Sequence, residues 1–340
     1  MTLLFGAARH GPSPFAMPSD LGGLALVRKN AITECNSKSI ENTLIPSVAR
    51  ESTLGGEAGK ECRMTSDPGP REAWVELKHP VLRGEGKNVA YLTCPPEFDP
   101  NCAFFIVLFF HGFEKPLEIQ VAKHALAAQV AGAKRNCLLV CPRSSLGDRS
   151  GDNPGLFARD AQVSGFLEEL PEHIGALAPA VAPAIVEARA AAAPLVVATF
   201  SGGHSLASRM LVHEGARRRV ECCAFFDSLY GSDEYFRNPL AVLRTAALVA
   251  IHRDDYDSTP GTYEHDKHKD LQRSLGGRGF ASSLDRVERL GAGVAVLQSV
   301  GNTGHWSIVS KGSPLEKILA KFQPRDGQPY SLRQPERPSV

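Results

Sequence analysis

The sequence predicts an α/β fold in which helices cover both faces of a mostly parallel central sheet. Short, continuous apolar runs recur along the chain, as expected for strands that are buried on both faces. Segments with helical patterns lie between these runs, and this alternation is typical of a parallel sheet. The apolar runs span 103–110, 136–142, 195–200, 220–227, 246–252 and 292–300. The helical patterns span roughly 117–134, 157–178, 203–214, 233–244, 264–275 and 314–322.

Two further strands precede this alternation. Segments 73–78 and 88–95 are separated by a turn at 84–86, so we expect an antiparallel pair that leads into the sheet. Residues 1–70 are rich in Gly, Ser and Pro and hold two aromatic residues, which predicts a loosely packed N-terminal extension. Residues 71–322 then form the α/β domain, and residues 323–340 form a proline-rich tail.

Composition excludes several classes of protein. The chain has 340 residues, with 38 Lys plus Arg and 37 Asp plus Glu, and this balance argues against a nucleic-acid-binding surface. The apolar run 103–110 is far shorter than the roughly 20 residues that a membrane-spanning helix needs. The first residues lack the basic region of a signal peptide, so we expect a cytoplasmic protein.

The cysteines and histidines indicate no metal centre. No Cys-x-x-Cys pair is present, and Cys94 and Cys102 could form a hairpin disulfide only in an exported protein. His265 and His268 share a helical spacing but have no evident third ligand, so we interpret them as part of a solvated helix. The Gly-x-Gly-x-x-Gly and Walker A motifs are absent. We therefore expect neither a metal nor a cofactor.

The carboxyl ends of the strands are the place to look for function, because ligands bind there in sheets of this class. In chain order, the residues after the strands include a serine, several acids and a histidine. The segments concerned are 111–113, 143–145, 201–203, 227–228, 253–255 and 301–305.

The segment around Ser201 resembles a nucleophile elbow, the sharp strand-to-helix turn that carries a catalytic serine. An apolar strand runs to Phe200, and Ser201 follows it directly, with two glycines before the next helix. The Gly-x-Ser-x-Gly pattern is met except that Thr199 replaces the first glycine. A second frame would centre on Ser205, but the strand would then have to include two glycines. The alternative, purely structural interpretation is a turn in which Ser201 caps the following helix.

Together, these residues resemble the α/β-hydrolase superfamily of serine hydrolases. The resemblance covers 73–322 and rests on His111-Gly112, the elbow at 199–203, the acids after two strands and Gly304-His305. It implies Ser201 as nucleophile and His305 as general base. It also implies an oxyanion hole formed by the N–H groups of Gly202 and Phe113.

The acid of the implied triad has more than one candidate. The superfamily usually carries it after the strand that corresponds to 246–252, which favours Asp255 and leaves Asp254 as a neighbour. Some members use the preceding strand, which here ends at Asp227.

The resulting hypothesis is a serine hydrolase that acts on a small-molecule carboxylic ester or thioester through an acyl-enzyme. Thr199 and the open choice of acid motivate an alternative, a non-catalytic protein of the same fold that binds a small ligand. In a further alternative, residues 1–70 mediate a protein interaction.

Overall fold

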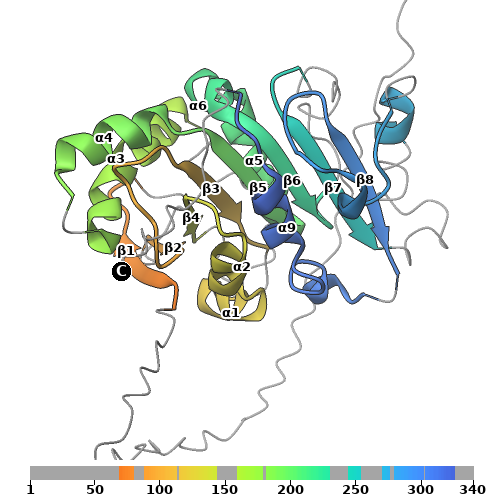
Figure 1. Cartoon of the computed structure of the whole chain (residues 1–340), viewed down its shortest axis with the longest axis horizontal. Helices are drawn as coiled ribbons and strands as arrows, with labels where there is room; N and C mark the ends of the chain where they lie inside the picture. Colours follow the sequence, from red (N-terminus) through yellow and green to blue (C-terminus); the bar gives the residue numbers. More distant parts are fainter. Residues whose placement is uncertain are drawn as a thin grey trace, which may run out of the picture. The chain divides into compact units, whose positions relative to one another are not determined.

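A computed structural model describes residues 69–79, 88–112, 115–143, 159–178, 181–229, 244–253, 270–275, 279–301 and 303–325. Its centre is an eight-stranded sheet in the order β1-β2-β4-β3-β5-β6-β7-β8 (Figure 1). β2 pairs antiparallel with both β1 and β4, and every other pairing is parallel. The strands are β1 (Arg71–Glu76), β2 (Val89–Cys94), β3 (Phe105–Phe110), β4 (Cys137–Pro142), β5 (Leu195–Phe200), β6 (Val220–Phe226), β7 (Ala247–Arg253) and β8 (Ala295–Val300).

Helices cover both faces of this sheet, which confirms the predicted α/β class with a mostly parallel central sheet (Figure 1). α3, α4, α5 and α6 supply buried residues to one face, whereas α1, α2 and α9 supply them to the other. The helices are α1 (Leu117–Lys123), α2 (Leu126–Gly132), α3 (Asp160–Leu177), α4 (Pro183–Ala192), α5 (His204–Val212), α6 (Glu214–Arg219) and α9 (Pro314–Lys321). Short 3₁₀ turns are η2 (Ser201–Gly203), η5 (Leu284–Arg286) and η6 (His305–Ser307).

The two faces account for the continuous apolar strands. Along β3, Ile106, Leu108 and Phe110 pack in the core under α3–α6. Phe105, Val107 and Phe109 pack in the core under α1, α2 and α9. Alternate side chains point to opposite faces of a strand, so a strand buried on both faces has no position for an exposed polar residue.

The structure differs from the helix pattern expected from the sequence at three points. The expected helix 117–134 is broken at Ala125, which adopts a left-handed conformation with φ 49°. The expected helix 203–214 ends at Val212, and His213 caps α6 by accepting a hydrogen bond from Ala216 N at 3.1 Å. α4 was not expected, although it begins at a proline and is rich in alanine, the residue with the highest helix propensity.

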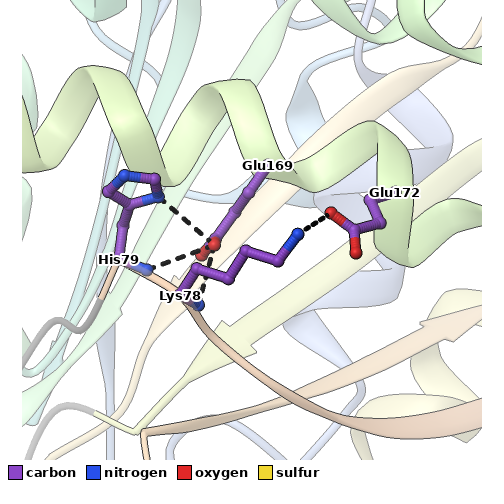
Figure 2. Close-up of polar contacts among 4 residues, drawn as sticks. All are labelled: Lys78, His79, Glu169 and Glu172. Carbon is purple, nitrogen blue, oxygen red and sulfur yellow. Dashed lines mark hydrogen bonds and ion pairs between the residues drawn. The ribbon is translucent and has the colours of Figure 1, made fainter.

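A buried carboxylate ties the end of β1 to α3 (Figure 2). Glu169 Oε2 accepts hydrogen bonds from the backbone N–H groups of Lys78 and His79, at 2.8 and 3.1 Å. His79 Nδ1 lies 3.3 Å from the same oxygen, and Lys78 also pairs with the exposed Glu172. The Glu169 contacts satisfy two backbone donors just after the strand ends, where no ladder partner remains.

Two further expectations concern the described part of the chain. No disulfide joins Cys94 to Cys102, both of which the structure describes, and Cys102 Sγ donates to Asp99 Oδ2. None of the helices that the structure describes has the length and apolar character needed to cross a membrane.

Candidate active site

Ser201 lies at a strained turn between β5 and α5. It directly follows the last residue of β5 and has φ 50°, in the left-handed region that non-glycine residues rarely adopt. Such strain is concentrated at functional sites because the surrounding structure must maintain it. Ser205, the other candidate, lies within α5, and its hydroxyl is 3.4 Å from the Gly202 carbonyl oxygen.

Close approach of the backbone explains the glycines around the turn. A Cβ on Gly203 would lie 2.1 Å from the carbonyl oxygen of Phe110, at the end of β3. A Cβ on Gly112 would lie 2.9 Å from Cβ of Ser201. Gly112, just after β3, therefore packs directly against Ser201.

Thr199, which departs from the usual elbow pattern, takes part in a hydrogen-bond chain. Its hydroxyl is fully buried and donates to Ser228 Oγ at 2.7 Å. Ser228 Oγ in turn donates to the Ser201 carbonyl oxygen at 2.6 Å. The chain links β5 to the residues after β6 and supports the strained backbone at Ser201. The sequence analysis gave Ser228 no role, although it directly follows the candidate acid Asp227.

Gln120 of α1 holds the loop after β3. Its Nε2 donates to the Gly112 carbonyl oxygen at 2.6 Å, and its Oε1 accepts from Gly112 N at 3.1 Å. His111 Nδ1 lies 2.7 Å from the same carbonyl oxygen. Both polar groups of Gly112 are thus fixed by one buried amide side chain. Sequence reasoning missed Gln120, because a glutamine ten residues after a strand carries no motif.

His305 contacts Asp227 across the carboxyl ends of the strands. His305 begins η6 in the segment after β8, and Asp227 directly follows β6. His305 Nδ1 is 2.6 Å from Asp227 Oδ2. A proton on Nδ1 that is donated to this carboxylate leaves Nε2 unprotonated, which is the form that a general base requires.

Arg253 at the end of β7 shares this carboxylate oxygen. Its Nε donates to Asp227 Oδ2 at 2.8 Å. The Asp227 side chain is 1% exposed and that of Arg253 is 15% exposed. Among the described residues, none donates a hydrogen bond to the other carboxylate oxygen, Oδ1. Arg253 was among the strand-end residues singled out in the sequence, but no role was predicted for it.

Aromatic rings surround the imidazole of His305. The ring of Phe200, the residue before Ser201, has its centroid 4.7 Å from that of His305. Trp306 packs on Phe200 at 5.3 Å, and Lys123 Nζ lies 4.9 Å from the Trp306 ring centroid. His124 packs on both rings, with its centroid 4.7 Å from Phe200 and 6.4 Å from Trp306. These contacts restrict the rotation of the His305 ring.

Two histidines near the site are held neutral. Burial lowers the pKa of His111 to about 4 and that of His124 to about 3. Within the described ranges, neither ring nitrogen of His124 has a hydrogen-bond partner. Uncharged imidazoles here add no positive charge beside His305 at neutral pH.

Several predicted residues lie outside the described residues. These are Phe113, Asp254 and Asp255, together with His265 and His268. Within the described ranges, no three His, Cys, Asp or Glu side chains are grouped so that they could hold a metal ion. Among the candidate acids, Asp227 is the one that the structure describes, and it contacts His305.

Comparisons with known proteins give structural similarity only. No protein-family model matches this chain, and no curated protein matches it. An S-formylglutathione hydrolase from Agrobacterium tumefaciens is 14% identical, with a TM-score of 0.47, covering 74% of this chain and 95% of its own. The feruloyl esterase module from Clostridium thermocellum is 13% identical, with a TM-score of 0.47, covering 75% and 88%. Identities this low say nothing about the activity of this chain.

Proposed function

We propose that this chain is a serine hydrolase that cleaves a small carboxylic ester or thioester through Ser201, His305 and Asp227. The observation that carries the proposal is the 2.6 Å contact between His305 Nδ1 and Asp227 Oδ2, with the His305 ring packed on the residue before the strained Ser201. A buried carboxylate hydrogen-bonded to Nδ1 of a histidine orients the imidazole so that Nε2 can act as the base.

The proposed reaction has two stages. Ser201 Oγ attacks the carbonyl carbon of the substrate while His305 Nε2 takes the serine proton. The tetrahedral intermediate then expels an alcohol or thiol, which leaves with that proton, and an acyl-enzyme remains. A water molecule, deprotonated by His305, attacks the acyl carbon, and Ser201 departs as the proton returns to it. The products are a carboxylic acid and the regenerated hydroxyl of Ser201.

The developing negative charge needs fixed donors. We propose the backbone N–H of Gly202 as one donor and that of Phe113 as the other. The close approach of Gly112 to Ser201, fixed by Gln120, supports a role for this loop. Removal of a single donor from an oxyanion hole costs about 10²–10³ in kcat in other hydrolases.

Asp227 is proposed as the acid because it is the carboxylate in contact with His305. It would hold the imidazole in the tautomer with the proton on Nδ1 and stabilise the imidazolium formed during attack. The Asp255 expectation rested on the more common position of the acid in the superfamily, whereas Asp227 rests on a described contact.

A panel of p-nitrophenyl esters and acyl thioesters of increasing chain length tests the proposal. We expect steady-state turnover by the native chain, and a loss of at least about 10³-fold in kcat for Ser201→Ala. Ser205→Ala is the matched control, because it removes a hydroxyl four residues away and should retain most of the activity. Turnover that survives Ser201→Ala would contradict the proposal. Binding of these esters without turnover would favour the non-catalytic alternative.

A further inference from the structure

Arg253 places a positive charge on Asp227, the proposed catalytic carboxylate, and the sequence did not predict this contact. β6 and β7 are neighbouring parallel strands with Phe226 paired to Ile251, so the residues that follow them meet at one edge. Asp227 follows β6, and Arg253 ends β7 at the position near which the superfamily usually carries the acid. Arg253 Nε and His305 Nδ1 both contact the single oxygen Oδ2 of Asp227.

We propose that Arg253 is a positioning residue of the active site, which keeps Asp227 ionised and holds its shared oxygen toward His305. This inference rests on the proposed function, because it gives Arg253 a role in that same triad.

Burial creates the need for such a residue. The Asp227 side chain is 1% exposed, and a carboxylate removed from water takes up a proton unless a cation or hydrogen-bond donors stabilise its charge. The neutral imidazole of His305 supplies a donor but no charge before reaction. An arginine remains protonated at all relevant pH values and therefore supplies a permanent charge.

Geometry gives Arg253 a second effect. The Arg253 bond at 2.8 Å and the His305 bond at 2.6 Å converge on Oδ2, so the carboxylate cannot rotate that oxygen away without losing both. The backbone N–H of Asp227 also donates to the Ile251 carbonyl oxygen on β7, at 2.8 Å. The acid is thus fixed to β7 through both its backbone and its side chain.

Among the described residues, other ionisable groups lie near the pair. His124, which directly follows α1, is neutral because burial lowers its pKa to about 3, and Lys123 of α1 lies over Trp306. On β7, His252 precedes Arg253 and is buried. On η6, His305 is itself the partner. Arg253 is the cation that directly contacts Asp227 in the described part of the chain.

Two effects of removing this cation point in the same direction. Without Arg253, the buried carboxyl of Asp227 is more easily protonated. Where Asp227 stays ionised, its charge is no longer balanced by Arg253, so it stabilises the imidazolium form of His305 more strongly. Both changes inactivate the base at low pH. The acid limb of the pH–rate profile therefore moves to higher pH, as a property of the coupled pair.

The test is the pH dependence of the second-order rate of inactivation by a fluorophosphonate, together with kcat/KM on the best ester. We expect Arg253→Gln and Arg253→Met to move the acid limb upward by about one pH unit or more. Arg253→Lys keeps the charge, so its limb should stay near that of the native chain while the plateau rate falls. Arg273→Gln is the control, since it breaks an Arg–Asp pair at the surface with Asp270.

A double variant covers the case in which neither neutral variant folds. In an Asp227→Asn background the buried charge is gone, so adding Arg253→Gln should leave the inactivation rate within about twofold of that background. A further large loss would overturn the proposal, as would an unmoved acid limb in the single variants. A change confined to KM for anionic esters would also overturn it, because it would mean that Arg253 binds substrate. If the native chain itself neither reacts nor turns over, the proposed function fails rather than this inference.

Discussion

Two residues of the proposed triad hold unusual backbone conformations. Ser201 has φ 50° and Asp227 has φ 46°, and neither is a glycine. Strain of this kind costs of order 1–3 kcal/mol per residue and persists only where other contacts oppose it. Ser228 bonds the Ser201 carbonyl, and Ile251 accepts the Asp227 N–H. The strain at both residues is thus supported by contacts between neighbouring strand ends.

Asparagine substitutions compare the candidate acids at the residue scale. We expect Asp227→Asn to lower kcat by about 10²–10⁴, because an amide cannot hold the His305 tautomer or stabilise the imidazolium. Asp255→Asn is matched in chemistry and should change kcat by less than about threefold. Steady-state kinetics on the best p-nitrophenyl ester measures both. The reverse ranking would make Asp255 the acid and would contradict the Asp227 assignment.

The sequence pointed to Ser201 and His305 as candidates but did not decide between the candidate acids. Ser201 follows an apolar strand and precedes two glycines, so its local pattern identifies the turn. Asp227 and Asp255 both follow apolar strands, and nothing local separates them. The choice depends on which carboxylate meets His305, 78 residues beyond Asp227. The Arg253 contact depends in the same way on the pairing of β6 with β7.

At the element scale, α1 supports the site through one side chain. Gln120 bonds both the N–H and the carbonyl of Gly112, and Gly112 packs against Ser201. α1 is short because the chain takes a left-handed conformation at Ala125, between α1 and α2. Nothing in the sequence signals the break, because alanine favours the helix interior.

Replacement of Gln120 should therefore affect catalysis as well as stability. We expect Gln120→Met to lower kcat by about 10-fold or more, since an oxyanion donor that is no longer fixed loses part of its effect. Gln129→Met is the matched control. Gln129 is also a buried amide, but it bonds the backbone N–H groups of Leu315 and Glu316 at the start of α9.

Both glutamine variants should lower the free energy of unfolding by about 1–3 kcal/mol, because each leaves buried backbone groups unpaired. Urea denaturation measures this loss of stability. Steady-state kinetics on the folded variants measures the loss of kcat separately. If both variants lost kcat equally, the effect of Gln120 would be one of general stability.

At the scale of the whole molecule, the buried histidines make stability depend on pH. The folded-state pKa is about 4 for His111 and about 3 for His124, both below the ordinary value of 6.5. At a pH between the folded-state pKa and 6.5, the unfolded chain binds more protons than the folded chain. The free energy of unfolding therefore falls as the pH drops below about 6.5. Well inside that window each histidine contributes a slope of about 1.4 kcal/mol per pH unit.

His124→Leu isolates one of these contributions. The imidazole nitrogens of His124 have no hydrogen-bond partner in the part of the chain that the structure describes, so a leucine should be tolerated in the apolar cluster. We expect the variant to lose less stability than the native chain between pH 5.5 and 4.5, by roughly 1 kcal/mol. Urea denaturation at the two pH values gives the difference. An unchanged slope would mean that His124 is not buried and neutral in the folded state.

The fold itself was the most predictable property, because it follows from composition along each strand. The strands β3 to β7 are buried along all or nearly all of their length, and the segments between neighbouring strands are long enough for crossover helices. Helix ends were less predictable. The His213 cap and the left-handed Ala125 are local interactions that periodicity does not report. α4 was missed because an alanine-rich segment has no clear apolar stripe.

Covalent labelling with a fluorophosphonate, followed by mass-spectrometric mapping of the adduct, tests directly whether Ser201 is the activated nucleophile. We expect one adduct on Ser201, which is absent in Ser201→Ala and forms much more slowly in His305→Ala and Asp227→Asn. Ser205→Ala should be labelled at the native rate. An adduct on Ser205, or no adduct on the folded native chain, would contradict the claim that Ser201 is the activated nucleophile.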